Sequence, residues 1–404
     1  GRGTKIILKL KDGEKEFSFK ETVERIIKKY SNFVSYKITL NGNRVNTLDA
    51  IWLKPKSEVT EEQHKEFFNY LSQGAGGDPL YTIQFSTDVP MSIHSLFYVP
   101  QSHTEMLGMG KMEPGVNVHS RKVLIKAKHR EILPDWLRFL RGAVDSEDLP
   151  LNISREHLQD SPLIRKINGI LTRRIIKFFA DMIKTDRAKY AKFFDDFGRF
   201  FKEGISTDFL YKDDLGKLLL FDSSSMTNGE RTTIPEYIER MKGDQTNIFY
   251  IVAPSRSVAE SSPYYEVFKK KGIEVLFAYN PADEFVMGSM GYFEGKEIKS
   301  VEKSELDHHE EEQNTESSSL SDEQVNELAA WIKQTLPSKI SSVKSTKRLS
   351  DTPAIIKNPE NSAMRMLRKM QTQSNDLPLD PQQLEINPKH PVIVKLYSAK
   401  NINE

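Results

Sequence analysis

The sequence contains no cysteine, and this absence removes several classes of function. A disulfide scaffold, a zinc site built from thiolates and a cysteine nucleophile are all excluded. The sequence also lacks any apolar run near the roughly 18 residues that a membrane-spanning helix needs. Its formal net charge is only +1, so no overall field attracts nucleic acid or an anionic membrane. We therefore expect no membrane span and no nucleic-acid partner.

The signatures of common catalytic sites are missing as well. Residues 108–111 end in a lysine but lack the spacing and the hydroxyl residue of a phosphate-binding loop. No metalloprotease helix motif and no Gly-x-Ser-x-Gly elbow occurs. His308 and His309 could bind a metal, but three glutamates follow them, and a solvated tract is the favoured interpretation. No metal site is predicted.

The length and composition indicate several ordinary globular domains. The chain has 404 residues, of which 28% are charged and 38% hydrophobic. This length is too great for one core and suggests two to four domains. The fold class that we predict is α/β, in the sense of an α+β multidomain chain. Its predicted parts are the end of an amino-terminal domain with a short linker (1–30), a large layered α/β subdomain (31–160), a helical connector (161–206), a small α/β subdomain (207–303), a linker (304–320) and a partial C-terminal domain (321–404).

Hydrophobic periodicity supplies the elements behind this division. Strands are predicted at residues 4–11, 34–40, 81–85, 93–99, 122–127, 247–252, 274–278 and 342–349, from their β-branched and aromatic runs. Helices are predicted at residues 21–30, 60–71, 263–271 and 321–336, and across 155–203. The helix between strands 247–252 and 274–278 makes a βαβ unit. The phenylalanine stripe of residues 193–201 is interpreted as core.

An acidic loop that opens into a helix is the most unusual local pattern. Residues 142–159 carry three acidic side chains, then Pro150, then Arg155 in the first turn of the expected helix. A helix start carries partial positive charge, so an arginine there works against the local field. It is tolerated if it points at an anion that the helix start also attracts, which is the arrangement of a phosphate sensor. The simpler alternative is that Arg155 pairs with Asp145 or its acidic neighbours.

Further candidates have an open interpretation. Asp145 and Glu147 could form a paired-carboxylate acid/base site, although a solvated turn is favoured. Trp52 stands in a turn-like setting and could be an anchor for a partner, or it could be buried. Methionine suits surfaces that accept many partners, so a methionine-rich segment is either such a surface or core. Its members are Met364, Met366 and Met370.

Taken together, several segments closely resemble the heat shock protein 90 chaperone family. The longest is residues 136–156, and the others are residues 120–125, 189–194, 247–250 and 262–266. Within that family the chain looks most like the mitochondrial paralogue, on residues 46–52 and 63–67 and a short passage from 10 to 30. A bacterial-type member is the nearest competitor. The resemblance implies the mitochondrial matrix, with the cytoplasm as the alternative.

The resemblance also implies an ATP-dependent chaperone and roles for particular residues. The chain should be the middle domain plus part of the C-terminal domain. The domain that holds ATP with Mg²⁺ should precede it, the dimerisation helices of a homodimer should follow it, and alone it should hydrolyse little ATP. Arg155 is then the residue that reaches the γ-phosphate, Gln159 is the second catalytic-loop residue, and Asn152 and Ser154 support the loop. Unfolded or partly folded client proteins would contact Trp52 and the methionine segment.

Two other functions stay open from the residues alone. A scaffold that binds partners without nucleotide is suggested by the missing phosphate-binding loop. A hydrolase that uses Asp145 and Glu147 would be active in this chain by itself.

Overall fold

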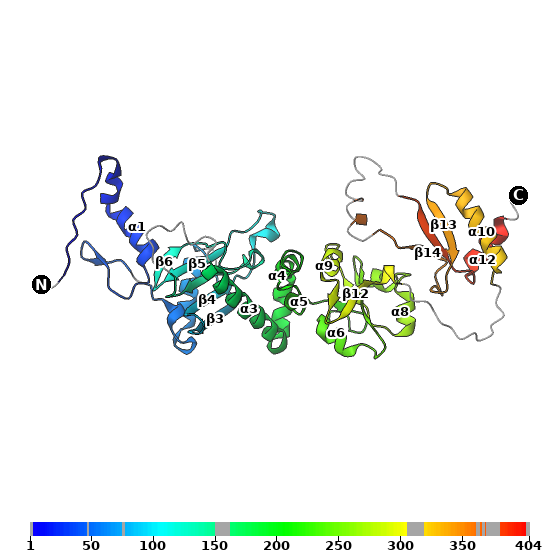
Figure 1. Cartoon of the computed structure of the whole chain (residues 1–404), viewed down its shortest axis with the longest axis horizontal. Helices are drawn as coiled ribbons and strands as arrows, with labels where there is room; N and C mark the ends of the chain where they lie inside the picture. The colour runs from blue at the N-terminus through cyan, green and yellow to red at the C-terminus, as the bar shows by residue number, and fades with distance from the viewer. Residues whose placement is uncertain are drawn as a thin grey trace. The chain divides into compact units, whose positions relative to one another are not determined.

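The computed structural model describes residues 3–46, 48–74, 77–149, 162–304, 319–360, 364–365, 368 and 380–400 (Figure 1). The chain divides into two compact units, Gly1–Phe200 and Phe201–Glu404. Helices and mixed sheets occur in both, which confirms the predicted α/β multidomain class. Within these ranges, no helix combines the length and the apolar character that crossing a membrane requires.

The first unit is built on a five-stranded mixed sheet of order β3-β4-β7-β5-β6. β7 is central, antiparallel to β4 and parallel to β5. The strands of this unit are β1 (Thr39–Leu40), β2 (Asn43–Arg44), β3 (Tyr81–Thr87), β4 (Ile93–Val99), β5 (Gly115–Ser120), β6 (Val123–Lys126) and β7 (Arg141–Asp145). Its helices are η1 (Asp12–Ser18), α1 (Lys20–Ser31), η2 (Ile51–Leu53), η3 (Lys56–Glu58), α2 (Glu61–Leu71), η4 (Thr104–Leu107), η5 (Asp135–Leu137), α3 (Pro162–Thr185) and α4 (Arg187–Thr207), the last of which runs into the second unit.

Two apolar layers hold this sheet. A cluster from α2, η2 and the sheet packs Trp52, Phe67 and Tyr98 together, all nearly inaccessible to solvent. Phe139, Phe179 and the phenylalanines of α4 form a second set of stacked rings, with Phe179 and Phe193 4.7 Å apart between centroids. The interpretation of the phenylalanine stripe as core is confirmed, because these rings are buried.

The second unit contains two sheets. The first has five strands in the order β11-β12-β9-β10-β8, and the second has three strands in the order β13-β15-β14. The predicted βαβ unit is confirmed, since β9 and β10 pair in parallel with helices between them. The strands are β8 (Asp222–Ser223), β9 (Asn247–Val252), β10 (Leu276–Ala278), β11 (Tyr292–Phe293), β12 (Lys296–Ser300), β13 (Ile340–Ser345), β14 (Ala354–Lys357) and β15 (Gln382–Ile386). The helices are α5 (Lys212–Gly216), α6 (Ile234–Arg240), α7 (Arg256–Glu260), α8 (Glu266–Lys271), α9 (Asp283–Met290), η7 (Val301–Lys303), α10 (Asp322–Thr335) and α12 (Pro391–Lys400).

Two predicted strands differ from the structure. Residues 4–11 form no strand, and Ile6, Ile7 and Leu8 are about four-fifths exposed. Of the predicted strand 34–40, only β1 remains. The reason is Asn46, which is buried and whose side chain bonds the carbonyls of Val34 and Tyr36 and the amide of Ile38. A single asparagine thus satisfies backbone groups that a strand ladder would otherwise have paired.

Candidate functional site

The site begins where β7 ends and the acidic loop starts. Residues 150–161 lie outside the described residues, and with them Arg155, Gln159, Asn152 and Ser154. The structure describes both segments that hold this loop, residues 145–149 before it and α3 after it. The geometry of these two anchors determines what the loop can do.

Asp145 is the first anchor, and it is buried. One carboxylate oxygen, Oδ2, accepts from the Trp52 indole N–H at 3.1 Å and from the Lys122 amide at 2.9 Å. Burial raises the pKa of Asp145, while these hydrogen bonds oppose the rise. The expectation that Asp145 lies on a solvated turn is therefore wrong: it ends a central strand with 3% of its surface exposed. Glu147 is exposed, so these two carboxylates do not share one environment.

The support behind Asp145 is aromatic and uncharged. The Trp52 ring lies 4.9 Å from the His119 ring and 4.8 Å from the Phe33 ring. Burial lowers the pKa of His119 to about 3, so this imidazole is neutral at physiological pH. For Trp52 the structure shows the buried alternative, with 1% exposure, and this side chain presents no surface to a partner. Its indole instead fixes the end of β7.

Residues 146–149 are held by the ends of two neighbouring strands. Ser120, at the end of β5, donates from its hydroxyl to the Leu149 carbonyl at 2.9 Å. The Ser146 amide donates to the His119 carbonyl at 3.2 Å. Asp148, although exposed, accepts from the Ser92 amide at 3.0 Å. The loop therefore leaves the sheet from a fixed point next to buried Leu149.

The second anchor is the first half of α3. Its apolar face buries Ile164, Ile167 and Leu171, as the residue spacing predicts. Asn168, on another side of the helix, donates to the Glu131 carbonyl at 2.9 Å. The described residues on both sides of the segment 150–161 are thus held by hydrogen bonds within the first unit.

The simpler interpretation of Arg155, an ion pair with Asp145 or its acidic neighbours, stays a prediction, because Arg155 lies outside the described residues. Of these carboxylates, Asp145 is buried and its Oδ2 accepts two hydrogen bonds. Glu147 and Asp148 are exposed.

Comparison with known proteins gives the chain its family. A sequence model described as Hsp90 protein matches residues 41–404. The chain is 46% identical, over its whole length, to "TNF receptor-associated protein 1 homolog, mitochondrial" of Dictyostelium discoideum, covering 57% of that protein. It is 45% identical to "Heat shock protein 75 kDa, mitochondrial" of Bos taurus, with 99% of the chain and 58% of the relative aligned. It is 42% identical to "Chaperone protein HtpG" of Desulfitobacterium hafniense, with 98% and 64% aligned.

The chain belongs to the Hsp90 family. The resemblance found in the sequence is confirmed, including the likeness to the mitochondrial relatives. The chain spans roughly three fifths of the length of these Hsp90 relatives.

Of the methionine segment, the structure describes only Met364, Arg365 and Arg368. Met364 is 44% exposed, while Met366 and Met370 lie outside the described residues. Next to Met364, Arg365 donates to both oxygens of Glu302, with the shortest contact at 2.8 Å. This bidentate pair ties the segment to η7.

Sequence reasoning missed the residues that anchor the loop. Trp52 and Asp145 are 93 positions apart, and Ser92 and Asp148 are 56 apart. No local pattern signals such pairs. Among the described ranges of this Hsp90 chain, no group of three or more histidine, aspartate or glutamate side chains is placed to hold a metal ion.

Proposed function

We propose that this chain is the middle part of an ATP-dependent molecular chaperone and carries the arginine that contacts the γ-phosphate. The observation that carries the proposal is that the described residues on both sides of the segment 150–161, which contains Arg155, are held in place: Ser120 bonds the Leu149 carbonyl and Asn168 of α3 bonds the Glu131 carbonyl. Relatives whose names contain "chaperone" or "heat shock" align over nearly the whole chain. Their names support the chaperone activity but assign no role to a residue.

The chemistry assigned to the loop is positioning and charge stabilisation. A guanidinium is always charged and offers a fixed fork of donors that matches phosphate oxygens. Arg155 would therefore stabilise the charge that develops on the transferring phosphoryl group. Gln159 would act beside it, with Asn152 and Ser154 supporting the loop. ATP with Mg²⁺, held mainly by an amino-terminal domain, would supply the reactive phosphate.

The described anchor before the loop suits this role. Asp145 accepts hydrogen bonds from the indole N–H of Trp52 and from the amide of Lys122, which are both neutral donors. In the proposal, Arg155 therefore serves the phosphate and not this carboxylate. Loops positioned by a rigid scaffold commonly carry residues that complete a site.

Location and partners follow from the same relatives. The word "mitochondrial" in two of their names supports the mitochondrial matrix as the compartment. Unfolded or partly folded clients would contact exposed apolar side chains, among which Met364 belongs to the segment singled out in the sequence. We expect a homodimer in the full-length protein.

The test is Arg155→Ala in a full-length protein, with Arg173→Ala as the matched control. Arg173 is an exposed arginine on α3. ATP turnover should fall by about a hundredfold or more in the first variant, since contacts to a transferring phosphoryl group are worth factors of this order. ATP binding and the turnover of the control should stay near the wild-type values. Normal turnover in Arg155→Ala would show that the assigned role is wrong.

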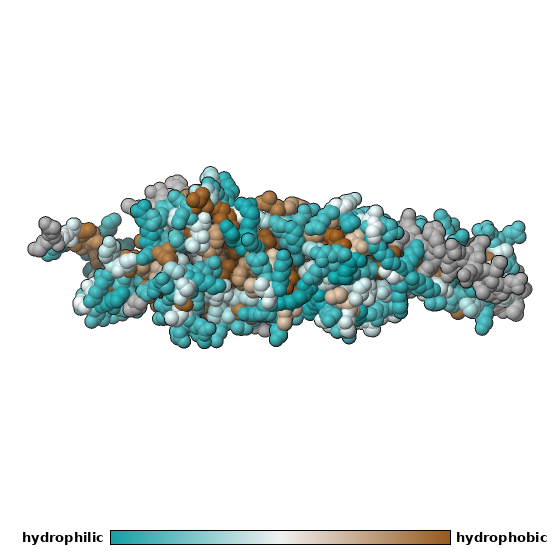
Figure 2. All heavy atoms as spheres, turned by 90° about the horizontal axis from the view of Figure 1, so that it is seen from below, coloured by the Kyte–Doolittle hydropathy of each residue, from teal (hydrophilic) through white to brown (hydrophobic). Residues whose placement is uncertain are grey.

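A nucleotide-independent scaffold is the second candidate, and exposed apolar side chains favour it. Phe209 and Leu210 are about three quarters exposed, and the face in Figure 2 shows apolar groups interrupting a mostly hydrophilic surface. Adding a separately prepared amino-terminal domain and ATP to this chain distinguishes the two. Stimulated hydrolysis supports the chaperone cycle, whereas partner binding that ignores nucleotide supports the scaffold.

A further inference from the structure

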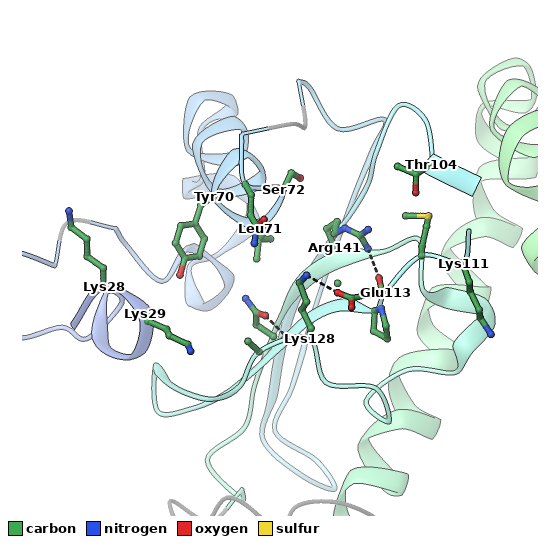
Figure 3. Close-up of a pocket in the computed structure, with 16 residues that line it drawn as sticks. Lys28, Lys29, Tyr70, Leu71, Ser72, Thr104, Lys111, Glu113, Lys128 and Arg141 are labelled. Atoms are coloured by element: carbon green, nitrogen blue, oxygen red, sulfur yellow. Dashed lines mark hydrogen bonds and ion pairs between the residues drawn. The ribbon is translucent and has the colours of Figure 1, made fainter. Parts of the chain in front are cut away.

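A cationic cavity lies in the first unit, on residues that the proposed function does not use. Its volume is about 620 Å³, within the range of small-molecule sites. Parts of α1, the end of α2, the segment 111–117, residues 127–128 and the start of β7 line it (Figure 3). Five cationic side chains and one carboxylate, that of Glu113, belong to this lining; the cations are Lys28, Lys29, Lys111, Lys128 and Arg141.

Arg141 is the most unusual of these cations. Among the described residues, its guanidinium donates to backbone carbonyls, those of Arg138 at 2.9 Å, Leu140 at 3.2 Å and Glu113 at 3.5 Å. Within the described part of the chain, no carboxylate forms an ion pair with it. Burial lowers the pKa of Arg141, opposed by Glu113. Its positive charge is therefore poorly compensated, and an incoming anion would restore what desolvation removed.

The backbone is shaped to keep Arg141 in place. A Cβ atom on Gly115 would lie 2.3 Å from both Cδ and Nη1 of Arg141 and 2.7 Å from the Leu140 carbonyl. Only glycine allows the guanidinium to lie this close to the neighbouring strand. The fork of donors is thus positioned before any ligand arrives, which reduces the entropic cost of binding.

Lys128 is placed by an equally specific turn. Its backbone is left-handed, with φ 49°, and its amide donates to the Asn117 side chain at 3.0 Å. Its ammonium contacts Glu113 at 3.0 Å, at the rim. Figure 3 shows Lys29 and the Tyr70 hydroxyl on the opposite side of the cavity from Arg141. Cations and a hydroxyl donor from distant segments therefore surround one space.

We propose that this cavity binds a small oligophosphate anion. Arginine matches phosphate oxygens through two parallel N–H donors, and the lysines supply point charges around it. The cavity volume of about 620 Å³ suits a compact ligand, whereas an extended acidic peptide requires a longer groove. The lining residues have no role in the proposed function, so the proposal adds a ligand and does not depend on that function.

The experiment titrates sodium tripolyphosphate into the 404-residue chain by calorimetry at low salt. The test variant is Lys29→Gln with Lys128→Gln. The control is Lys269→Gln with Lys217→Gln, which removes the same charge elsewhere. Lys269 lies in the last turn of α8 as Lys29 does in α1, and Lys217 pairs with Asp214 at 2.9 Å much as Lys128 pairs with Glu113.

The test variant should bind about tenfold more weakly, since each partly screened charge contact is worth about 0.5–1 kcal/mol. The control should stay within about twofold of the wild type. Glu113→Gln should bind more tightly, a gain that damage to the fold would not produce. Equal affinity in the two double variants, or no detectable binding to the wild type, would overturn the proposal. So would loss of binding in Arg155→Ala, or tighter binding of hexaglutamate than of tripolyphosphate.

Discussion

Two carboxylates of the first unit, Glu105 and Asp145, have little solvent exposure at the side chain but are compensated in different ways. Glu105 receives two hydrogen bonds from Arg138, at 2.7 and 3.1 Å, and one from the Met112 amide at 2.9 Å. Burial acts to raise its pKa, but Arg138 and the amide outweigh it and lower the pKa to about 2. Within the described part of the chain, Asp145 accepts hydrogen bonds from neutral donors, and burial raises its pKa.

The two carboxylates therefore have different structural roles. The Glu105–Arg138 pair joins η4 to η5, and both side chains are at most 6% exposed. Its strength comes from a bidentate contact away from water. Among the described residues, the hydrogen bonds that Asp145 accepts come from neutral donors. In this domain, a charged partner therefore compensates one carboxylate, and indole and amide donors compensate the other.

The largest effect is expected when the Glu105–Arg138 ion pair is removed. Arg138→Ala should lower the free energy of unfolding by about 3–5 kcal/mol, because it removes the bidentate cationic partner of a carboxylate whose side chain is 6% exposed. Arg199→Ala is the control: this arginine approaches the same carboxylate at 3.7 Å, but its side chain is 54% exposed. It should cost less than about 1 kcal/mol. Urea unfolding followed by tryptophan fluorescence measures both, and similar losses would show that burial does not distinguish the two arginines.

A smaller effect on stability is expected at Asp145. In Asp145→Asn, the amide oxygen can take the place of Oδ2, which accepts both hydrogen bonds. The stability should change by no more than about 1 kcal/mol, since two contacts survive and a buried charge is removed. The same urea experiment measures this change. A loss of stability as large as that of Arg138→Ala would mean that the contacts of Asp145 depend on its charge. It would remove the contrast between Glu105 and Asp145.

The contrast also shows where sequence reasoning succeeds and fails. Capping boxes at Thr60 and Ser321 are readable, because the cap and its partner lie three residues apart. The strand 93–99 and the βαβ unit are likewise local patterns. Asp145 looked solvated because its acidic neighbours dominate the local composition, while its partner Trp52 is distant in sequence.

The candidate site divides in the same way. Arg155 was singled out because a cation at a predicted helix start contradicts a local electrostatic rule, and its role stays a prediction since it lies outside the described residues. The cavity around Arg141 could not be found, since its lysines come from segments about a hundred residues apart and meet only in the folded chain. Rules about residues that are close in sequence can be applied to the sequence alone. Rules that concern charge compensation need the tertiary structure.

The smallest and most discriminating effect is the pH dependence of the two carboxylates. Folding lowers the pKa of Glu105 from 4.5 to about 2, so its contribution to stability is present above 4.5 and is lost as the pH falls toward 2. Folding raises the pKa of Asp145 above 3.8, so its contribution is present below 3.8 and is lost as the pH rises through the folded value.

Neutral amides remove these titrations and should reveal opposite slopes. Relative to the wild type, Glu105→Gln should become less stable as the pH rises from the onset of acid unfolding to 4.5. Asp145→Asn should become more stable, relative to the wild type, as the pH rises above 3.8. Urea unfolding at a series of pH values gives both slopes. Because a general loss of packing shifts both variants in the same direction, slopes of the same sign would contradict the assignment of one carboxylate to a cation and the other to neutral donors.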